Sequence, residues 1–135
     1  MNWKKFAPAF AVAFVINATG GFVIHGRLLQ SDYAQYPNLL RAQEDAQAYF
    51  PYMLLSLLFF SLGFVWIYAQ GVEQKPWLGQ GIRFGLAVWV ITSLAWFLTY
   101  YAIQPWSGSV VARQIGYELV EKLLLGVCVA ALYRK

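Results

Sequence analysis

Five polar residues lie inside otherwise apolar stretches of the chain, where their side chains could do chemistry. Asn17 and His25 are eight residues apart, a spacing that puts them on one face of a helix. Glu118 precedes Lys122 by four residues, and Glu121 lies beside them. A histidine near a carboxylate changes its charge between about pH 5 and 7. The five residues are therefore a candidate polar, proton-sensitive cluster.

A structural role for the same residues is an open alternative. A lone histidine at a helix end often serves only as an interfacial hydrogen-bonding group. Glu118 and Lys122 stand in the i, i+4 order in which a carboxylate and an ammonium neutralise each other on one helix. If the last apolar stretch enters the membrane near Gly116, Lys122 lies about 9 Å below that point, where its long side chain reaches the outer headgroups.

Glycines and one arginine point to packing and to lipid contact. Gly81 and Gly85 form a small-xxx-small pattern, and Gly126 continues the spacing of Glu118 and Lys122. Small residues at such positions let two helix backbones approach closely, so we expect all three glycines at helix contacts. Arg83 lies near the inner interface, where we expect its guanidinium to contact lipid headgroups.

The sequence contains no familiar catalytic or cofactor motif. No Ser or Cys nucleophile is paired with a His, and neither a multi-His metal set nor a Gly-rich phosphate loop occurs. Cys128 is the only cysteine, so the chain cannot form an internal disulfide or a thiolate metal cage. We therefore expect no enzyme, no catalytic residue and no metal site, and the sequence leaves any cofactor unknown.

Apolar helices must position these residues. The 135 residues are 60% hydrophobic and 12% charged, with a mean hydropathy of +0.51, whereas soluble domains are roughly 25% charged. A chain this short could not bury so much apolar surface from water. Its net charge of +4 comes from cations scattered between apolar runs, which indicates no nucleic-acid partner. The composition predicts an integral membrane protein.

Four stretches are long enough to cross the hydrocarbon core, which is about 30 Å thick. They are residues 6–25, 50–70, 82–103 and 114–133, and we expect the first to be a retained anchor rather than a cleaved signal peptide. The external loop 26–49 should contain a short helix at 39–47, which either lies on the membrane surface or runs straight into the second span. The prediction is one all-α transmembrane domain over residues 1–135, an up-down-up-down four-helix bundle.

The distribution of cations predicts the orientation of this bundle. Six of the ten Lys and Arg residues fall on the side of the two termini, namely Lys4, Lys5, Lys75, Arg83, Arg134 and Lys135. Three fall on the opposite side, and Lys122 lies within the last stretch. Because Lys and Arg are enriched in cytoplasmic segments, we expect both ends in the cytoplasm. A multi-pass protein of a bacterial inner membrane fits this pattern.

Two function classes remain open. An accessory or structural subunit of a larger membrane assembly fits four short-looped spans without a soluble domain, and this is the favoured expectation. A small oligomeric transporter or channel is the alternative, in which the polar residues would line a pathway near the outer leaflet. The expected partners are the lipid bilayer and either other membrane chains or further copies of the same chain. A polar cavity would favour the transporter.

Overall fold

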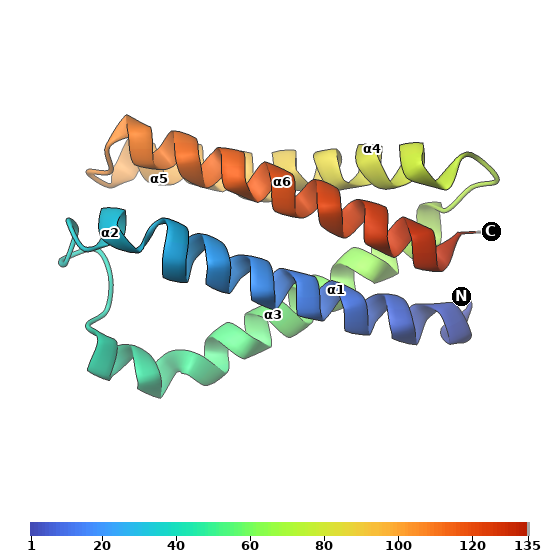
Figure 1. Ribbon diagram of the computed structural model, residues 1–135, viewed down its shortest axis with the longest axis horizontal. Helices are drawn as coiled ribbons and strands as arrows, with labels where there is room; N and C mark the ends of the chain where they lie inside the picture. The colour runs from blue at the N-terminus through green and yellow to red at the C-terminus, as the bar shows by residue number, and fades with distance from the viewer. Residues whose placement is uncertain (135) are drawn as a thin grey trace.

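The computed structural model describes residues 1–134, is 84% helical and contains no strand in that range (Figure 1). Helix α1 (Trp3–Val23) continues into a π-helical segment, η1 (Ile24–Leu28), and a short α2 (Gln30–Tyr33) follows. Helix α3 (Gln43–Gly71) is the longest. The third rod consists of α4 (Trp77–Trp89), a second π-helical segment η2 (Val90–Leu94) and α5 (Ala95–Ile103), and α6 (Gly108–Tyr133) ends the fold.

Three helical rods are apolar and long enough to cross a membrane. They are Trp3–Leu28, Gln43–Gly71 and Trp77–Ile103. Large apolar side chains such as Phe22, Phe59 and Ile91 point out of the protein and are more than half exposed. Since exposing such side chains to water is costly, these rods indicate a membrane protein. The prediction of an all-α fold with membrane-crossing helices is thus confirmed for three helices; α6 is long enough but more charged.

Successive rods run in opposite directions, and α6 lies between α1 and the α4–η2–α5 rod (Figure 1). Both chain ends lie at one end of the fold, where the backbone N–H of Asn2 donates to the Tyr133 hydroxyl at 3.0 Å. We call this the terminal end. At the opposite end, the loop end, the connections 29–42 and 104–107 meet, and the Ser107 N–H donates to the Tyr36 hydroxyl at 3.0 Å.

Apolar side chains from all four rods form a core toward the terminal end. Phe84 of α4 packs edge-on against Phe64 and Tyr68 of α3, with ring centroids 4.7 and 5.3 Å apart. The buried set consists of Phe6, Ala9, Ala13, Phe64, Val65, Tyr68, Val72, Val88, Leu125, Val129, Ala130 and Tyr133.

Glycines bring the backbones of α4 and α6 into direct contact. A Cβ atom on Gly81 would lie 2.6 Å from the carbonyl oxygen of Gly126, and one on Gly85 would overlap the carbonyl of Lys122. A Cβ on Gly126 would in turn overlap Gly81. The small residues at these positions are thus required by the approach of the two helices.

Helix α3 leaves the bundle toward the loop end. Its residues 43–56 are all exposed, and in Figure 1 its first half diverges from α1. The short helix expected at 39–47 is helical only from Gln43, as the first turn of α3. Residues 39–42 form a turn and a bend without regular helix. Just before them, the Tyr36 ring packs on Trp106 with centroids 4.7 Å apart.

Candidate functional site

One face of α6 carries a stripe of buried polar side chains. Gln114, Glu118, Glu121 and Lys122 are each at most 8% exposed. Helix α6 begins at Gly108, where the Ser107 hydroxyl caps it by accepting from the Val110 N–H. Lys122 therefore lies about 21 Å along α6 from Gly108. Its side chain is buried and paired, which does not fit the alternative in which it reaches the headgroups.

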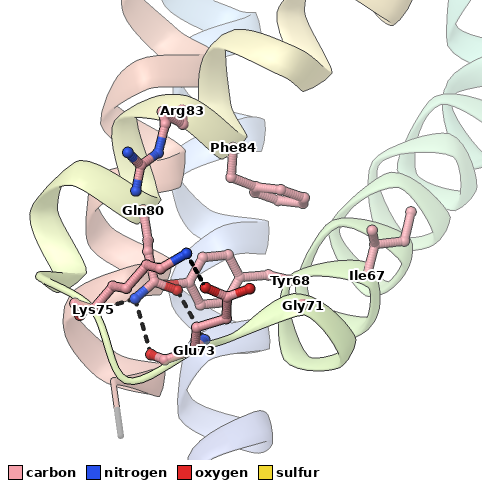
Figure 2. Close-up of a pocket in the computed structure, with 8 residues that line it drawn as sticks. All are labelled: Ile67, Tyr68, Gly71, Glu73, Lys75, Gln80, Arg83 and Phe84. Carbon is pink, nitrogen blue, oxygen red and sulfur yellow. Dashed lines mark hydrogen bonds and ion pairs between the residues drawn. The ribbon is translucent and has the colours of Figure 1, made fainter.

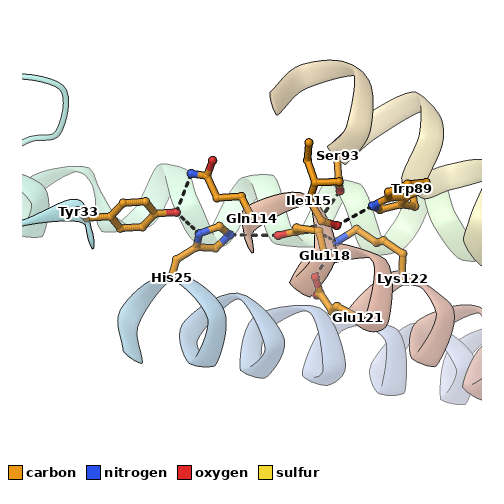
Figure 3. A network of polar contacts seen from close by, with 9 residues as sticks. All are labelled: His25, Tyr33, Trp89, Ser93, Gln114, Ile115, Glu118, Glu121 and Lys122. Carbon is orange, nitrogen blue, oxygen red and sulfur yellow. Dashed lines mark hydrogen bonds and ion pairs between the residues drawn. The ribbon is translucent and has the colours of Figure 1, made fainter. Parts of the chain in front are cut away.

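The stripe is the centre of a charge network between α1, α6 and the third rod (Figure 3). Lys122 Nζ donates to Glu118 Oε2 and to Glu121 Oε2, both at 2.7 Å. Glu118 Oε2 also accepts from the Ser93 hydroxyl at 3.1 Å, and its Oε1 lies 3.0 Å from His25 Nε2. Glu118 thus has partners on all three rods.

His25 extends the network toward the loop end. Its Nδ1 lies 2.6 Å from the Tyr33 hydroxyl, which also accepts from Gln114 Nε2 at 3.1 Å. An ionised Glu118 can only accept, so a neutral imidazole carries its proton on Nε2 and accepts from Tyr33 at Nδ1. A protonated imidazole donates from both nitrogens to the same two partners. His25 can therefore take up a proton without losing either contact.

The buried network is short of one positive charge when His25 is neutral. With both carboxylates ionised, Glu118 and Glu121 contribute two negative charges and Lys122 contributes one positive charge, a net charge of −1. An uncompensated charge away from water is costly, so the site favours binding of a proton or another cation. The network can therefore take up or release one positive charge, such as a proton.

Both π-helical segments contribute a side chain to this network. His25 lies in η1 and Ser93 lies in η2. A π-turn holds one more residue than an α-helical turn, and such segments are frequent at functional sites. The wider turn in η1 is closed by the Leu29 N–H donating to the Ile24 carbonyl at 2.9 Å. The two irregular turns thus aim both side chains at Glu118.

A cavity of about 410 Å³ at the loop end reaches the network. Its walls are aromatic and amide side chains with two leucines and the imidazole, namely His25, Tyr33, Leu39, Leu40, Phe97, Tyr100, Gln104, Trp106 and Gln114. The His25 side chain is 36% exposed. Burial raises the pKa of the Tyr33 phenol above its usual 10.0, with a smaller contribution from the nearby Glu118 charge. His25 therefore connects an accessible cavity to the buried charges.

A second ion pair fixes α2 over this cavity. Arg113 Nη2 donates to Asp32 Oδ1 at 2.7 Å, and the Asp32 side chain is only 9% exposed. This pair ties the residue next to Tyr33 to the first turns of α6. On the other side of α6, Trp89 Nε1 donates to the Ile115 carbonyl at 3.0 Å (Figure 3). The network is thus held at both flanks.

The structure gathers four of the five residues expected in the cluster. His25, Glu118, Glu121 and Lys122 are in contact. Asn17 is buried on α1 but makes no hydrogen bond to the network within residues 1–134. Tyr33, Ser93 and Gln114 belong to the network but are not among the five residues of the predicted cluster. Only the spacing of Gln114 from Glu118 signals this in the sequence, since it repeats the i, i+4 step.

Arg83 lies apart from this network, at the terminal end. It lines a hollow of about 420 Å³ between the end of α3 and the start of α4, together with Lys75, Gln80 and Phe84 (Figure 2). In the connection before α4, Lys75 pairs with Glu73, and Gln80 Nε2 donates to the carbonyls of Glu73 and Lys75 at 2.9 Å. The guanidinium thus lies beside the connection 72–76.

The described residues offer no evident metal site. Within residues 1–134, no three His, Cys, Asp or Glu side chains are placed to hold a metal ion. Cys128 is a free, half-buried thiol on α6. The groups that could bind a ligand are thus the carboxylates, the imidazole and the amides of the network.

Comparison with known proteins gives no match: no protein-family model, curated protein or solved structure is significantly similar to this chain.

Proposed function

We propose that the chain is a four-span membrane protein in which α6 is the fourth span. Support comes from its length of 26 residues, about 39 Å at 1.5 Å per residue, and from its position between α1 and α4. Its charged side chains in the middle of the helix are buried and paired, as intramembrane charges must be. The cation distribution supports cytoplasmic termini in a bacterial inner membrane, with Arg83 near the inner headgroups.

We propose further that the protein is a small, proton-responsive transporter or channel, working as an oligomer. The observation that carries this proposal is the unbroken polar chain from the loop-end cavity to the buried carboxylates. A proton reaching His25 from the cavity would balance the charge of the network. Because His25 and Gln114 also line the cavity, a bound solute would sense that proton directly.

Proton flux through reconstituted protein tests this proposal. Liposomes are loaded with a pH-sensitive dye and given an inward proton gradient, with valinomycin and potassium to cancel the membrane potential. Wild type should dissipate the gradient faster than empty liposomes, and His25→Phe should remove the difference. Ile91→Ala, a change at an exposed side chain of η2, is the control and should behave as wild type. Equal rates for wild type and empty liposomes would contradict the proposal.

A role as accessory subunit is a second candidate, supported by the first half of α3. Its exposed side chains include Tyr49, Phe50, Tyr52, Met53, Leu54, Leu55, Leu58 and Phe59. A diverging apolar helix of this kind offers a face to another membrane chain. The native mass after gentle extraction, with co-purifying chains identified, separates the two candidates. A fixed ratio to other proteins would favour the subunit, and a defined homo-oligomer would favour the transporter.

A further inference from the structure

A groove on the outer surface of the bundle runs between α1 and α6. Its volume is about 500 Å³, and its lining is almost entirely apolar. Val15, Ile16, Val23 and Ile24 line it from the α1–η1 rod, and Val120 and Leu124 line it from α6. Val120 is 67% exposed, so this groove opens sideways from the bundle, toward the region that lipid would occupy.

One carboxylate oxygen beside this groove lacks a partner. Glu121 lines the groove and points from α6 toward α1 (Figure 3). Its Oε2 accepts from Lys122, whereas its Oε1 is buried without a hydrogen-bond partner among residues 1–134. The Glu121 side chain is only 5% exposed. A buried acceptor left unpaired is costly, and a ligand that donates a hydrogen bond would remove that cost.

Gly20 leaves room for the carboxylate at the floor of the groove. A Cβ atom at this position would lie 2.8 Å from Glu121 Cγ and 2.9 Å from Oε1. Any side chain on residue 20 would therefore displace the carboxylate or cover it. The missing side chain on α1 leaves the buried carboxylate beside Gly20, and both residues line the groove.

From the groove, the unpaired oxygen and the charge of the network we infer a binding site for a hydrophobic amine. Its protonated nitrogen donates to Glu121 Oε1 and supplies the missing positive charge, while its apolar body fills the groove. Charge selects against a fatty acid, because a carboxylate would be repelled by Glu121 and Glu118. This ligand is a cation that dissolves in the bilayer.

The depth of Glu121 argues against a lipid headgroup as the occupant. Glu121 lies about 20 Å along α6 from Gly108 at 1.5 Å per residue. Tyr133 at the other end of α6 is about 18 Å from Glu121, so Glu121 lies near the middle of the helix. In a hydrocarbon core about 30 Å thick, a headgroup amine on either side is then about 15 Å from this oxygen. A single-chain or aromatic amine within the bilayer can reach it.

Binding of radiolabelled dodecylamine to protein in lipid nanodiscs tests the inference. Empty nanodiscs give the partition into lipid, which is subtracted. We expect saturable binding of one amine per chain, with dodecanol and dodecanoate failing to compete. Glu121→Gln should weaken binding by about tenfold or more, because it removes the charge-assisted hydrogen bond.

Two variants that place a tryptophan on the exposed surface test the groove without changing the charged network. Val120→Trp fills the groove from its open side and should abolish saturable binding. Ile91→Trp is the matched control, since Ile91 is 68% exposed but lies on η2, outside the groove. Equal binding by the two tryptophan variants, or purely non-saturable uptake by wild type, would overturn the inference. Dodecylamine binding and proton flux are separate measurements, so this inference and the proposed function can fail independently.

Discussion

In the half of the bundle toward the terminal end the helices meet through apolar side chains and bare glycine backbone, whereas from the middle of the bundle toward the loop end three rods meet through a hydrogen-bonded set of charges. The first half holds the rings of Phe64, Tyr68 and Phe84 and the close contact of Gly81 with Gly126. The loop-end half holds the network around Glu118, and α3 diverges there. One end is therefore built for stability, and the other keeps costly charges in place.

Buried charges are retained where a well-packed apolar core would be at least as stable. The two π-helical segments fall in this costly half, with His25 in one and Ser93 in the other. The aromatic cavity and the apolar groove also meet the network from two sides, at His25 and at Glu121. In the proposed function, binding and proton exchange belong to the loop-end half, and the apolar terminal end supplies rigidity.

Removing the one buried ammonium should have the largest effect on stability. Lys122→Met leaves Glu118 and Glu121 buried without their shared partner, and we expect a loss of about 3–5 kcal/mol in the free energy of unfolding. Unfolding in mixed micelles with increasing SDS measures it. Adding Glu118→Gln and Glu121→Gln to this variant removes all three charges and should recover most of the loss. A stable Lys122→Met protein would show that the network is not buried as described.

Adding a side chain at the glycine contact between α4 and α6 should have the next largest effect on the free energy of unfolding. Gly126→Ala puts a methyl group into the backbone of α4, and we expect a cost of about 1–3 kcal/mol from overpacking. Gly116→Ala is the matched control on the same helix, because no atom other than its chain neighbours and its own helix backbone lies within 4 Å of the added Cβ. The control should be neutral or slightly stabilising. If both variants lose the same stability in SDS titrations, the close approach of α4 and α6 is wrong.

Removing the Glu118 charge that faces His25 should change the pH dependence of the free energy of unfolding more than its value at a single pH. Glu118→Gln keeps the shape of the side chain but removes the charge that faces His25 Nε2. The difference in unfolding free energy between wild type and this variant should therefore change between about pH 5 and 7. Gly116→Ala serves again as a variant without contact to the network. A constant difference across this range would rule out coupling between the two residues.

Replacing Tyr33 should have the smallest effect on stability, and only at high pH. Because burial raises its pKa above 10.0 in the folded protein, the unfolded chain loses the phenol proton first as the pH rises. The stability that Tyr33 contributes is thus present below pH 10.0 and declines as the pH rises past that value. In Tyr33→Phe the decline of stability above pH 10.0 should be shallower than in wild type. If thermal unfolding shows the same decline of stability with pH in wild type and in Tyr33→Phe, the Tyr33 phenol is exposed to water.

The sequence predicted the helices and the charged centre because both leave strong local signals. Apolar runs show the rods, and the spacing of Glu118 and Lys122 shows one face of α6. The span predicted at 114–133 lies within α6, which begins six residues earlier because Ser107 caps a helix at Gly108. Ser93 carries no local signal, since a π-helical turn gives no periodic pattern. The contacts of Tyr36 with Trp106 and Ser107 at the loop end could not be predicted, because the partners are about 70 residues apart in the sequence.

The most direct test of the central claim is the protonation of His25 itself. It is the only histidine in the chain, so ¹⁵N-labelled imidazole gives one set of NMR signals without background. We predict that the pH dependence of these signals differs between wild type and Glu118→Gln, because Glu118 Oε1 lies 3.0 Å from His25 Nε2. Signals with the same pH dependence in the two proteins would contradict a proton-responsive network.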